Sequence, residues 1–124
     1  MKAIYIEDGL DFCIRHLLQE EAKEVWGCDE FESVSIIHGD RLTICERITS
    51  LIETADVVYF DYGGLTSGVC FHGIGDFIDY WNRFFINQIE EHPNKKWFCV
   101  SAVNTFREED RKQLEAVGVE FHKI

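Results

Sequence analysis

The sequence has little positive charge, a single proline and no closely spaced cysteine pair. Its 124 residues contain 12 Lys and Arg against 23 Asp and Glu, which gives a formal net charge of −11. Nucleic acids and anionic membranes attract positively charged surfaces, so neither is expected as a partner. A single proline also argues against a proline-rich linker or a disordered segment. We therefore expect one folded domain over residues 1–124.

Paired cysteines and targeting signals are missing as well. The chain has an odd number of cysteines and no C-x-x-C pair: Cys13, Cys28, Cys45, Cys70 and Cys99. This pattern favours reduced thiols over a disulfide framework. Met1 opens directly into a strand-like segment without a signal-peptide pattern, and no apolar run is long enough to span a bilayer. These absences predict a cytoplasmic protein.

What the sequence does contain is an alternation of two hydrophobic periods. Short apolar runs rich in β-branched and aromatic residues predict five strands, near residues 3–6, 34–37, 57–60, 97–100 and 119–122. Apolar residues at three- and four-residue spacing predict four intervening helices, within residues 10–25, 44–55, 77–89 and 105–117. This order predicts a three-layer α/β/α domain with a flavodoxin-like, five-stranded parallel sheet in strand order 2-1-3-4-5.

Local signals place the ends of these helices. Asp40 is the expected N-cap of the second helix, and Thr105 with Glu108 forms a capping box for the last one. Gly118 stands where a C-terminal glycine of that helix belongs. Three acidic residues of the first helix are expected on a solvated face: Glu20, Glu21 and Glu24.

Polar residues follow the predicted strands at their carboxyl ends, the edge at which sheets of this kind bind ligands. Glu7 and Asp8 follow the first strand, Asp61 ends the third, Ser101 follows the fourth, and Lys123 lies near the end of the fifth. Neighbouring carboxylates repel one another, and a divalent cation such as Mg²⁺ relieves that repulsion because it prefers oxygen ligands. A hydroxyl and an ammonium group opposite them suit a phosphoryl group.

This constellation resembles the receiver domain of two-component response regulators, the CheY-like fold. The stretch YIED matches the family's acidic pair with Glu7 and Asp8, and ADVVYFDYGGL matches its phosphoacceptor aspartate with Asp61. FCVSA and FHKI match its hydroxyl residue and lysine with Ser101 and Lys123. The resemblance implies a signalling domain with catalytic Asp61, Ser101 and Lys123. It also implies Mg²⁺ held by Glu7, Asp8 and Asp61, and a small phosphodonor or histidine kinase as partner.

A glycine-rich segment, residues 63–75, follows Asp61 and supports a second interpretation. It resembles a stretch of nucleoside deoxyribosyltransferase-like and related nucleotide-binding proteins, in which a small-residue turn opens a helix. The resemblance implies a nucleotide- or nucleoside-binding loop whose ligand-binding residues are Gly63, Gly64, Thr66, Ser67 and Gly68. The glutamate nucleophile of those enzymes has no counterpart in the residues that follow, 69–72, which favours binding over catalysis.

Two further interpretations stay open. Asp61 can cap the turn after its strand without any chemistry, since aspartate side chains often bond to the backbone there. The chain also ends at Ile124, directly after the fifth strand, so the last helix of a receiver domain is lacking. A bare flank beside an edge strand predicts a protein-interaction module, most simply a homodimer with two-fold symmetry.

Overall fold

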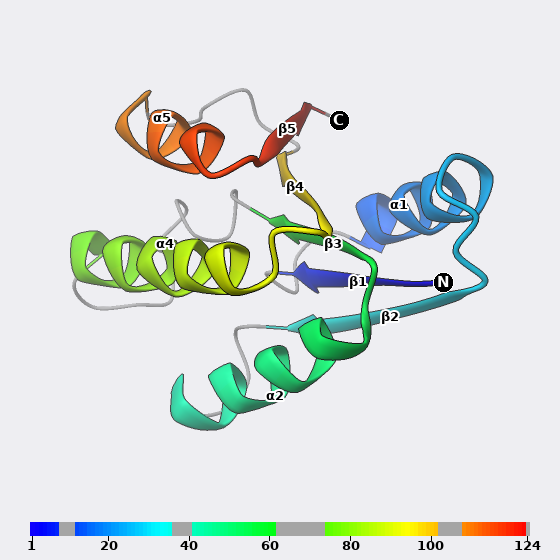
Figure 1. Cartoon of the computed structure of the whole chain (residues 1–124), viewed down its shortest axis with the longest axis horizontal. Helices are drawn as coiled ribbons and strands as arrows, with labels where there is room; N and C mark the ends of the chain where they lie inside the picture. The colour runs from blue at the N-terminus through cyan, green and yellow to red at the C-terminus, as the bar shows by residue number, and fades with distance from the viewer. Residues whose placement is uncertain (8–11, 36–40, 62–73, 102–107, 124) are drawn as a thin grey trace.

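The computed structural model describes residues 1–7, 12–35, 41–61, 74–101 and 108–123. Five strands form one sheet: β1 (Lys2–Glu7), β2 (Glu30–Ser35), β3 (Val57–Asp61), β4 (Lys96–Ser101) and β5 (Glu120–Lys123). The helices between them are α1 (Phe12–Glu24), α2 (Arg41–Thr54), α4 (Ile74–Glu91) and α5 (Glu108–Ala116). All strand pairs are parallel and the order is β2-β1-β3-β4-β5, which confirms the predicted fold class and strand order (Figure 1).

The sheet separates two hydrophobic cores. Alternate residues of β1 face opposite sides, so Ile4 and Ile6 enter one core while Ala3 and Tyr5 enter the other. The first core lies under α2, α4 and α5, and its Phe60 and Phe85 rings stack with centroids 4.4 Å apart. The second core is packed by α1 through residues such as Leu18. Figure 1 shows α1 set apart from the other three helices, as this division requires.

The second strand begins earlier than the sequence predicts. An apolar run places it at residues 34–37, whereas β2 spans Glu30–Ser35 and pairs with β1 from Lys2↔Glu30 to Glu7↔Ser35. Because β2 is an edge strand, most of its residues stay partly exposed and only Val34 is buried. Residues 36 and 37 lie outside the described residues. Backbone pairing with β1, rather than a hydrophobic run, therefore determines where this strand lies.

A Schellman-type turn closes α5 at the predicted glycine. Gly118 has a φ of 97°, a backbone conformation that favours glycine. The amide of Val119 donates to the carbonyl of Leu114 at 3.1 Å, and that of Gly118 donates to Glu115 at 3.0 Å. These are the two hydrogen bonds of that motif.

The expected caps Asp40 and Thr105 lie outside the described residues. Within the described ranges, no helix is both long and apolar enough to cross a bilayer.

Candidate functional site

The carboxyl ends of four neighbouring strands carry the predicted site. Glu7 ends β1, Asp61 ends β3, Ser101 ends β4 and Lys123 ends β5. The register pairs Asp61 with Val100, and Ser101 with Lys123. Adjacent strands lie about 4.8 Å apart, so the backbone positions of these four residues occupy one continuous edge. Of the four, only Glu7 has a described side chain, and Asp8 lies outside the described residues altogether.

The Glu7 carboxylate is buried and bound by an arginine of α1. Its side chain is 9% exposed, against 36% for Arg15. The Arg15 Nε donates to Oε2 of Glu7 at 2.9 Å, and Nη2 of Arg15 donates to Oε1. The guanidinium fork thus engages both oxygens, the geometry in which arginine binds a carboxylate most strongly. A buried carboxylate needs such a partner, because desolvation disfavours its charged form.

This pairing bears on the predicted Mg²⁺ ligands. Each Glu7 oxygen accepts one hydrogen bond from Arg15, so a metal ion could use only the lone pairs that the guanidinium leaves free. Within the described ranges, no group of three or more His, Cys, Asp or Glu residues is arranged to hold a metal ion. The other two predicted ligands, Asp8 and the Asp61 side chain, fall outside that part of the chain. Mg²⁺ binding through them stays a prediction.

The second predicted site falls outside the described part of the chain. Residues 62–73 are not described, so the structure does not test the nucleotide-binding interpretation of Gly63, Gly64, Thr66, Ser67 and Gly68. Helix α4 begins directly afterwards, at Ile74.

A polar cluster on the α1 face of the sheet was missed by the sequence analysis. Glu21 of α1 accepts a hydrogen bond from the Tyr59 hydroxyl at 2.8 Å. Nε2 of His122 lies 3.4 Å from the other carboxylate oxygen of Glu21. The Phe98 ring stacks on His122, with centroids 4.6 Å apart, and also on Tyr59, at 5.2 Å. Burial raises the pKa of Tyr59, and the Glu21 carboxylate raises it further. Glu21 thus belongs to a packed cluster, not to the solvated face expected for it.

Helical spacing contained a signal for this cluster. Glu21 lies three residues after Leu18 and seven after Ile14, both of which are buried, so it shares their side of α1. A small pocket of about 110 Å³ opens at the same place, lined by Leu17, Leu18, Glu21 and His122. A glutamate at that helical position faces the sheet, where a hydroxyl or an imidazole can reach it.

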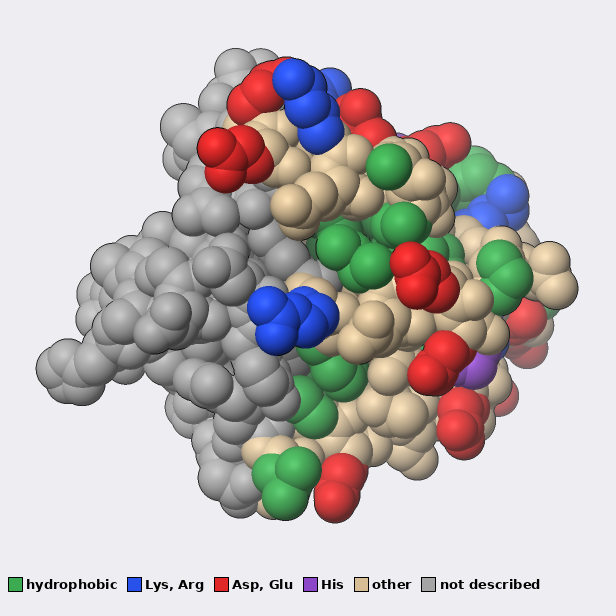
Figure 2. Space-filling view, turned by 60° about the vertical axis from the view of Figure 1, so that its left-hand side comes forward, with side chains coloured by type: hydrophobic (Ala, Val, Ile, Leu, Met, Phe, Trp, Pro, Cys, Tyr) green, Lys and Arg blue, Asp and Glu red, His purple; other side chains and the backbone are tan. Residues whose placement is uncertain are grey.

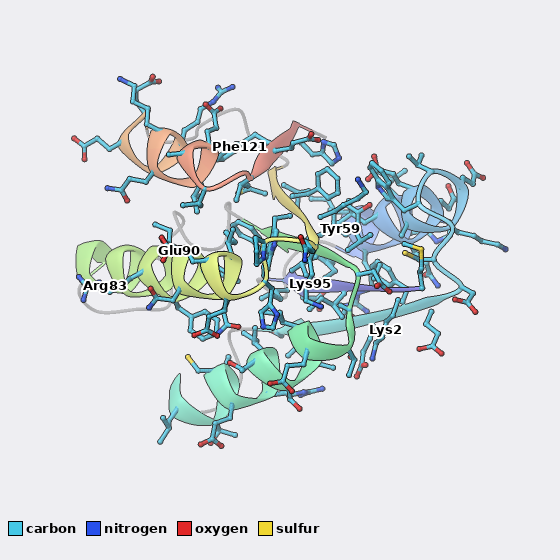
Figure 3. The ribbon with its side chains drawn as sticks, viewed as in Figure 1. Lys2, Tyr59, Arg83, Glu90, Lys95 and Phe121 are labelled. Carbon is cyan, nitrogen blue, oxygen red and sulfur yellow. The ribbon has the colours of Figure 1, made fainter. Side chains whose placement is uncertain are left out.

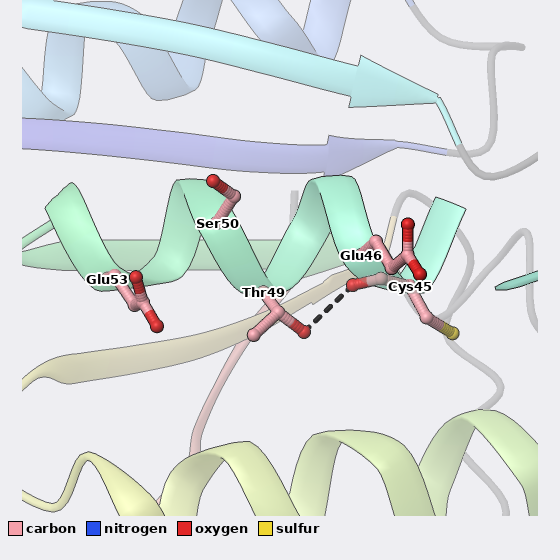
Figure 4. A pocket seen from close by; sticks show the side chains of 5 residues that line it. All are labelled: Cys45, Glu46, Thr49, Ser50 and Glu53. Carbon is pink, nitrogen blue, oxygen red and sulfur yellow. Dashed lines mark hydrogen bonds between the residues drawn. The ribbon is translucent and has the colours of Figure 1, made fainter. Parts of the chain in front are cut away.

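A larger hollow lies along α2. Its volume is about 370 Å³ and its lining residues are Cys45, Glu46, Thr49, Ser50 and Glu53 (Figure 4). The Thr49 hydroxyl donates to the carbonyl of Cys45 at 2.8 Å, and Nε2 of Gln88 on α4 lies 3.4 Å from the same hydroxyl. The two carboxylates at the rim disfavour an anionic ligand there. Figure 2 likewise shows acidic side chains spread over the described part of one face.

Comparisons with known proteins assign no family. No family model matches the chain, and no curated protein matches it. One solved structure that the chain resembles is the solution structure of a phosphate-loop protein, at 18% sequence identity. The match covers 94% of this chain and 88% of that chain, with a TM-score of 0.41. Likeness at this level says nothing about a ligand or an activity.

Proposed function

We propose that the chain is a receiver-like signalling domain in which Asp61 accepts a phosphoryl group. One observation supports this above the others: the sheet register brings Glu7, Asp61, Ser101 and Lys123 to one edge on four adjacent strands. These are the positions at which the sequence matches the receiver motifs. In parallel sheets of this order, ligands bind at that edge.

The proposed reaction is a transfer of a phosphoryl group to a carboxylate. An oxygen of Asp61 attacks the phosphorus of a phosphohistidine or a small phosphodonor, and an O–P bond forms. The bond from phosphorus to the donor breaks, and the donor leaves with that electron pair. The Ser101 hydroxyl and the Lys123 ammonium donate hydrogen bonds to the phosphoryl oxygens. The product is an aspartyl phosphate at the end of β3.

The cation requirement follows from charge. A phosphoryl group that approaches Asp61 meets a carboxylate at the attacking atom, and the chain as a whole carries a net charge of −11. Mg²⁺, when bound, would neutralise part of the negative charge on the transferring group. Glu7, Asp8 and Asp61 are the residues proposed to hold it, and Glu7 would do so with the lone pairs that Arg15 leaves free.

Intact-mass spectrometry after incubation with acetyl phosphate and Mg²⁺ tests the proposal. The expected result is one added phosphoryl group on the wild-type chain and none on Asp61→Asn. Asp56→Asn is a matched control, because Asp56 lies five residues earlier and binds the Lys2 amide at 3.0 Å, away from the carboxyl edge. Absence of added mass on the wild type, or the same mass gain on Asp61→Asn, would contradict the proposal.

A further inference from the structure

The hollow along α2 has a negatively charged rim whose carboxylates have no counterion. Glu46 and Glu53 lie at opposite ends of it, with Thr49 and Ser50 between them (Figure 4). Within the described ranges, neither glutamate forms an ion pair. Two unpaired carboxylates on one hollow, in a chain with a net charge of −11, attract cations.

A buried amide beside the same hollow has an acceptor without a donor. Gln88 of α4 is 8% exposed, and its Nε2 lies 3.4 Å from the Thr49 hydroxyl. That hydroxyl donates its own proton to the carbonyl of Cys45, so toward Gln88 it can only accept. This fixes the orientation of the amide and leaves Oε1 of Gln88 without a hydrogen-bond partner. Buried polar atoms of native proteins rarely lack a partner, so this acceptor points to a donor from outside the chain.

Charge, spacing and hydrogen-bonding groups together select the ligand. Glu46 and Glu53 are seven residues apart on one helix, which separates them by about 10.5 Å along the helix axis. An extended aliphatic chain of the length of spermidine spans this distance between its terminal ammonium groups, whereas a four-carbon diamine does not. Ammonium groups donate three hydrogen bonds and accept none, so they suit carboxylate, hydroxyl and amide oxygens. A ligand that binds at both ends gains affinity because the ends are linked.

We propose that the hollow along α2 binds a linear aliphatic polyamine, with one terminal ammonium at Glu46 and the other at Glu53. An N–H group between the two ends lies beside Thr49, where Oε1 of Gln88 lacks a donor. Both glutamates are exposed, and an exposed ion pair contributes little, so the dissociation constant should be in the millimolar range. The site shares no residue with the predicted phosphoryl-transfer site, so the proposal does not depend on the proposed function.

An amide NMR titration of the isotope-labelled chain with spermidine, at constant ionic strength, tests the site. Saturable shifts should concentrate on residues 45–53. The variant with both Glu46→Gln and Glu53→Gln should bind spermidine about tenfold more weakly, since each exposed ion pair contributes a few-fold in affinity.

The matched control is the variant with both Glu108→Gln and Glu115→Gln. These glutamates are also seven residues apart, but they lie on the exposed surface of α5. The control variant should bind spermidine as the wild type does. Equal weakening of both double variants, shifts spread evenly over the acidic surface, or no saturable shifts at all would overturn the proposal.

Two diamines of equal charge separate spanning of the hollow from charge alone. An eight-carbon terminal diamine reaches from Glu46 to Glu53, whereas a four-carbon one binds at one end only. The wild type should bind the longer diamine about fivefold more tightly, the contribution of one further exposed ion pair. In Glu53→Gln this advantage should shrink, because one end has lost its partner. Equal binding of the two diamines by the wild type, or an advantage that is unchanged in Glu53→Gln, would also overturn the proposal.

Discussion

Replacement of Tyr59 by phenylalanine should remove one hydrogen bond and leave the surrounding packing in place. Tyr59 has no exposed surface, and its hydroxyl donates to Oε2 of Glu21 at 2.8 Å. Its side chain lies on the face of the sheet that α1 covers (Figure 3). Phenylalanine keeps the ring and its stacking against Phe98, whose centroid is 5.2 Å away. The change therefore reports on the hydroxyl, not on a cavity.

The cost should be at the low end of the range for a hydrogen bond to a charged group. Such bonds contribute about 1.5–3 kcal/mol to stability. The side chain of Glu21 is 32% exposed and also lies near His122, so water can replace part of what the hydroxyl supplied. We expect Tyr59→Phe to lower the free energy of unfolding by about 1.5 kcal/mol. In a chain of this size this corresponds to a drop of about 5 °C in the melting temperature.

Urea unfolding at neutral pH measures this loss of stability. The same measurement on Glu21→Gln and on the variant with both changes completes a double-mutant cycle. The pKa of Tyr59 is raised in the folded chain above its ordinary value of 10.0, chiefly by burial. A group of this kind contributes stability that is full below the unfolded pKa and is lost as pH rises toward the folded pKa. Above about pH 10, the wild type should therefore lose stability faster than Tyr59→Phe. A difference between them below about 0.3 kcal/mol at neutral pH, and parallel alkaline profiles, would refute the reasoning.

Four shorter predictions follow from other parts of the molecule. Gly118→Ala should lower stability by about 1 kcal/mol in urea unfolding, because no atom crowds the site and only the φ of 97° opposes a side chain. Phe85→Ala should cost about 3–5 kcal/mol in the same assay, since this ring is 1% exposed and stacked in the larger core. Burial raises the pKa of the Cys28 thiol, so peptide mapping after brief iodoacetamide treatment at pH 8 should find Cys45, which is half-buried, labelled before Cys28. Light scattering coupled to size exclusion at micromolar concentration should give the mass of a homodimer, and a monomer mass at every concentration would contradict that prediction.

The parallel sheet could be predicted because a strand that is buried on both faces is apolar at every position. Residues 57–60 are apolar without interruption, and the structure buries all four between two helical layers. The predicted start of β2 was wrong for the opposite reason. Glu30 and Glu32 lie in an edge strand whose exposed residues carry no hydrophobic signal, and only the register with β1 places them there.

The candidate site was predictable as a set of positions and not as a set of contacts. Strand ends in a parallel sheet meet at one edge, so Glu7, Asp61, Ser101 and Lys123 could be grouped from the strand order alone. The partner of Glu7 could not, because Arg15 comes from the next helix and nothing in the helical period distinguishes an arginine that turns back toward the sheet. Glu21 was missed because its acidic neighbours suggested a solvated face.

The structure changes where a dimer contact should be sought. The sequence predicts a bare flank beside the fifth strand, and among the described helices α1 is the one that packs on that face of the sheet. Yet Phe98 on that face is only 2% exposed. The Trp26 ring packs against Phe98 with centroids 5.5 Å apart, and the His122 ring stacks on Phe98 with centroids 4.6 Å apart. Nζ of Lys96 in turn lies 4.4 Å from the Trp26 ring centroid. These aromatic side chains thus cover the Phe98 ring, which leaves little of it for a partner to bury. If the homodimer forms, β5 at the edge of the described sheet is the better place for the contact, because strand pairing does not depend on an open apolar face.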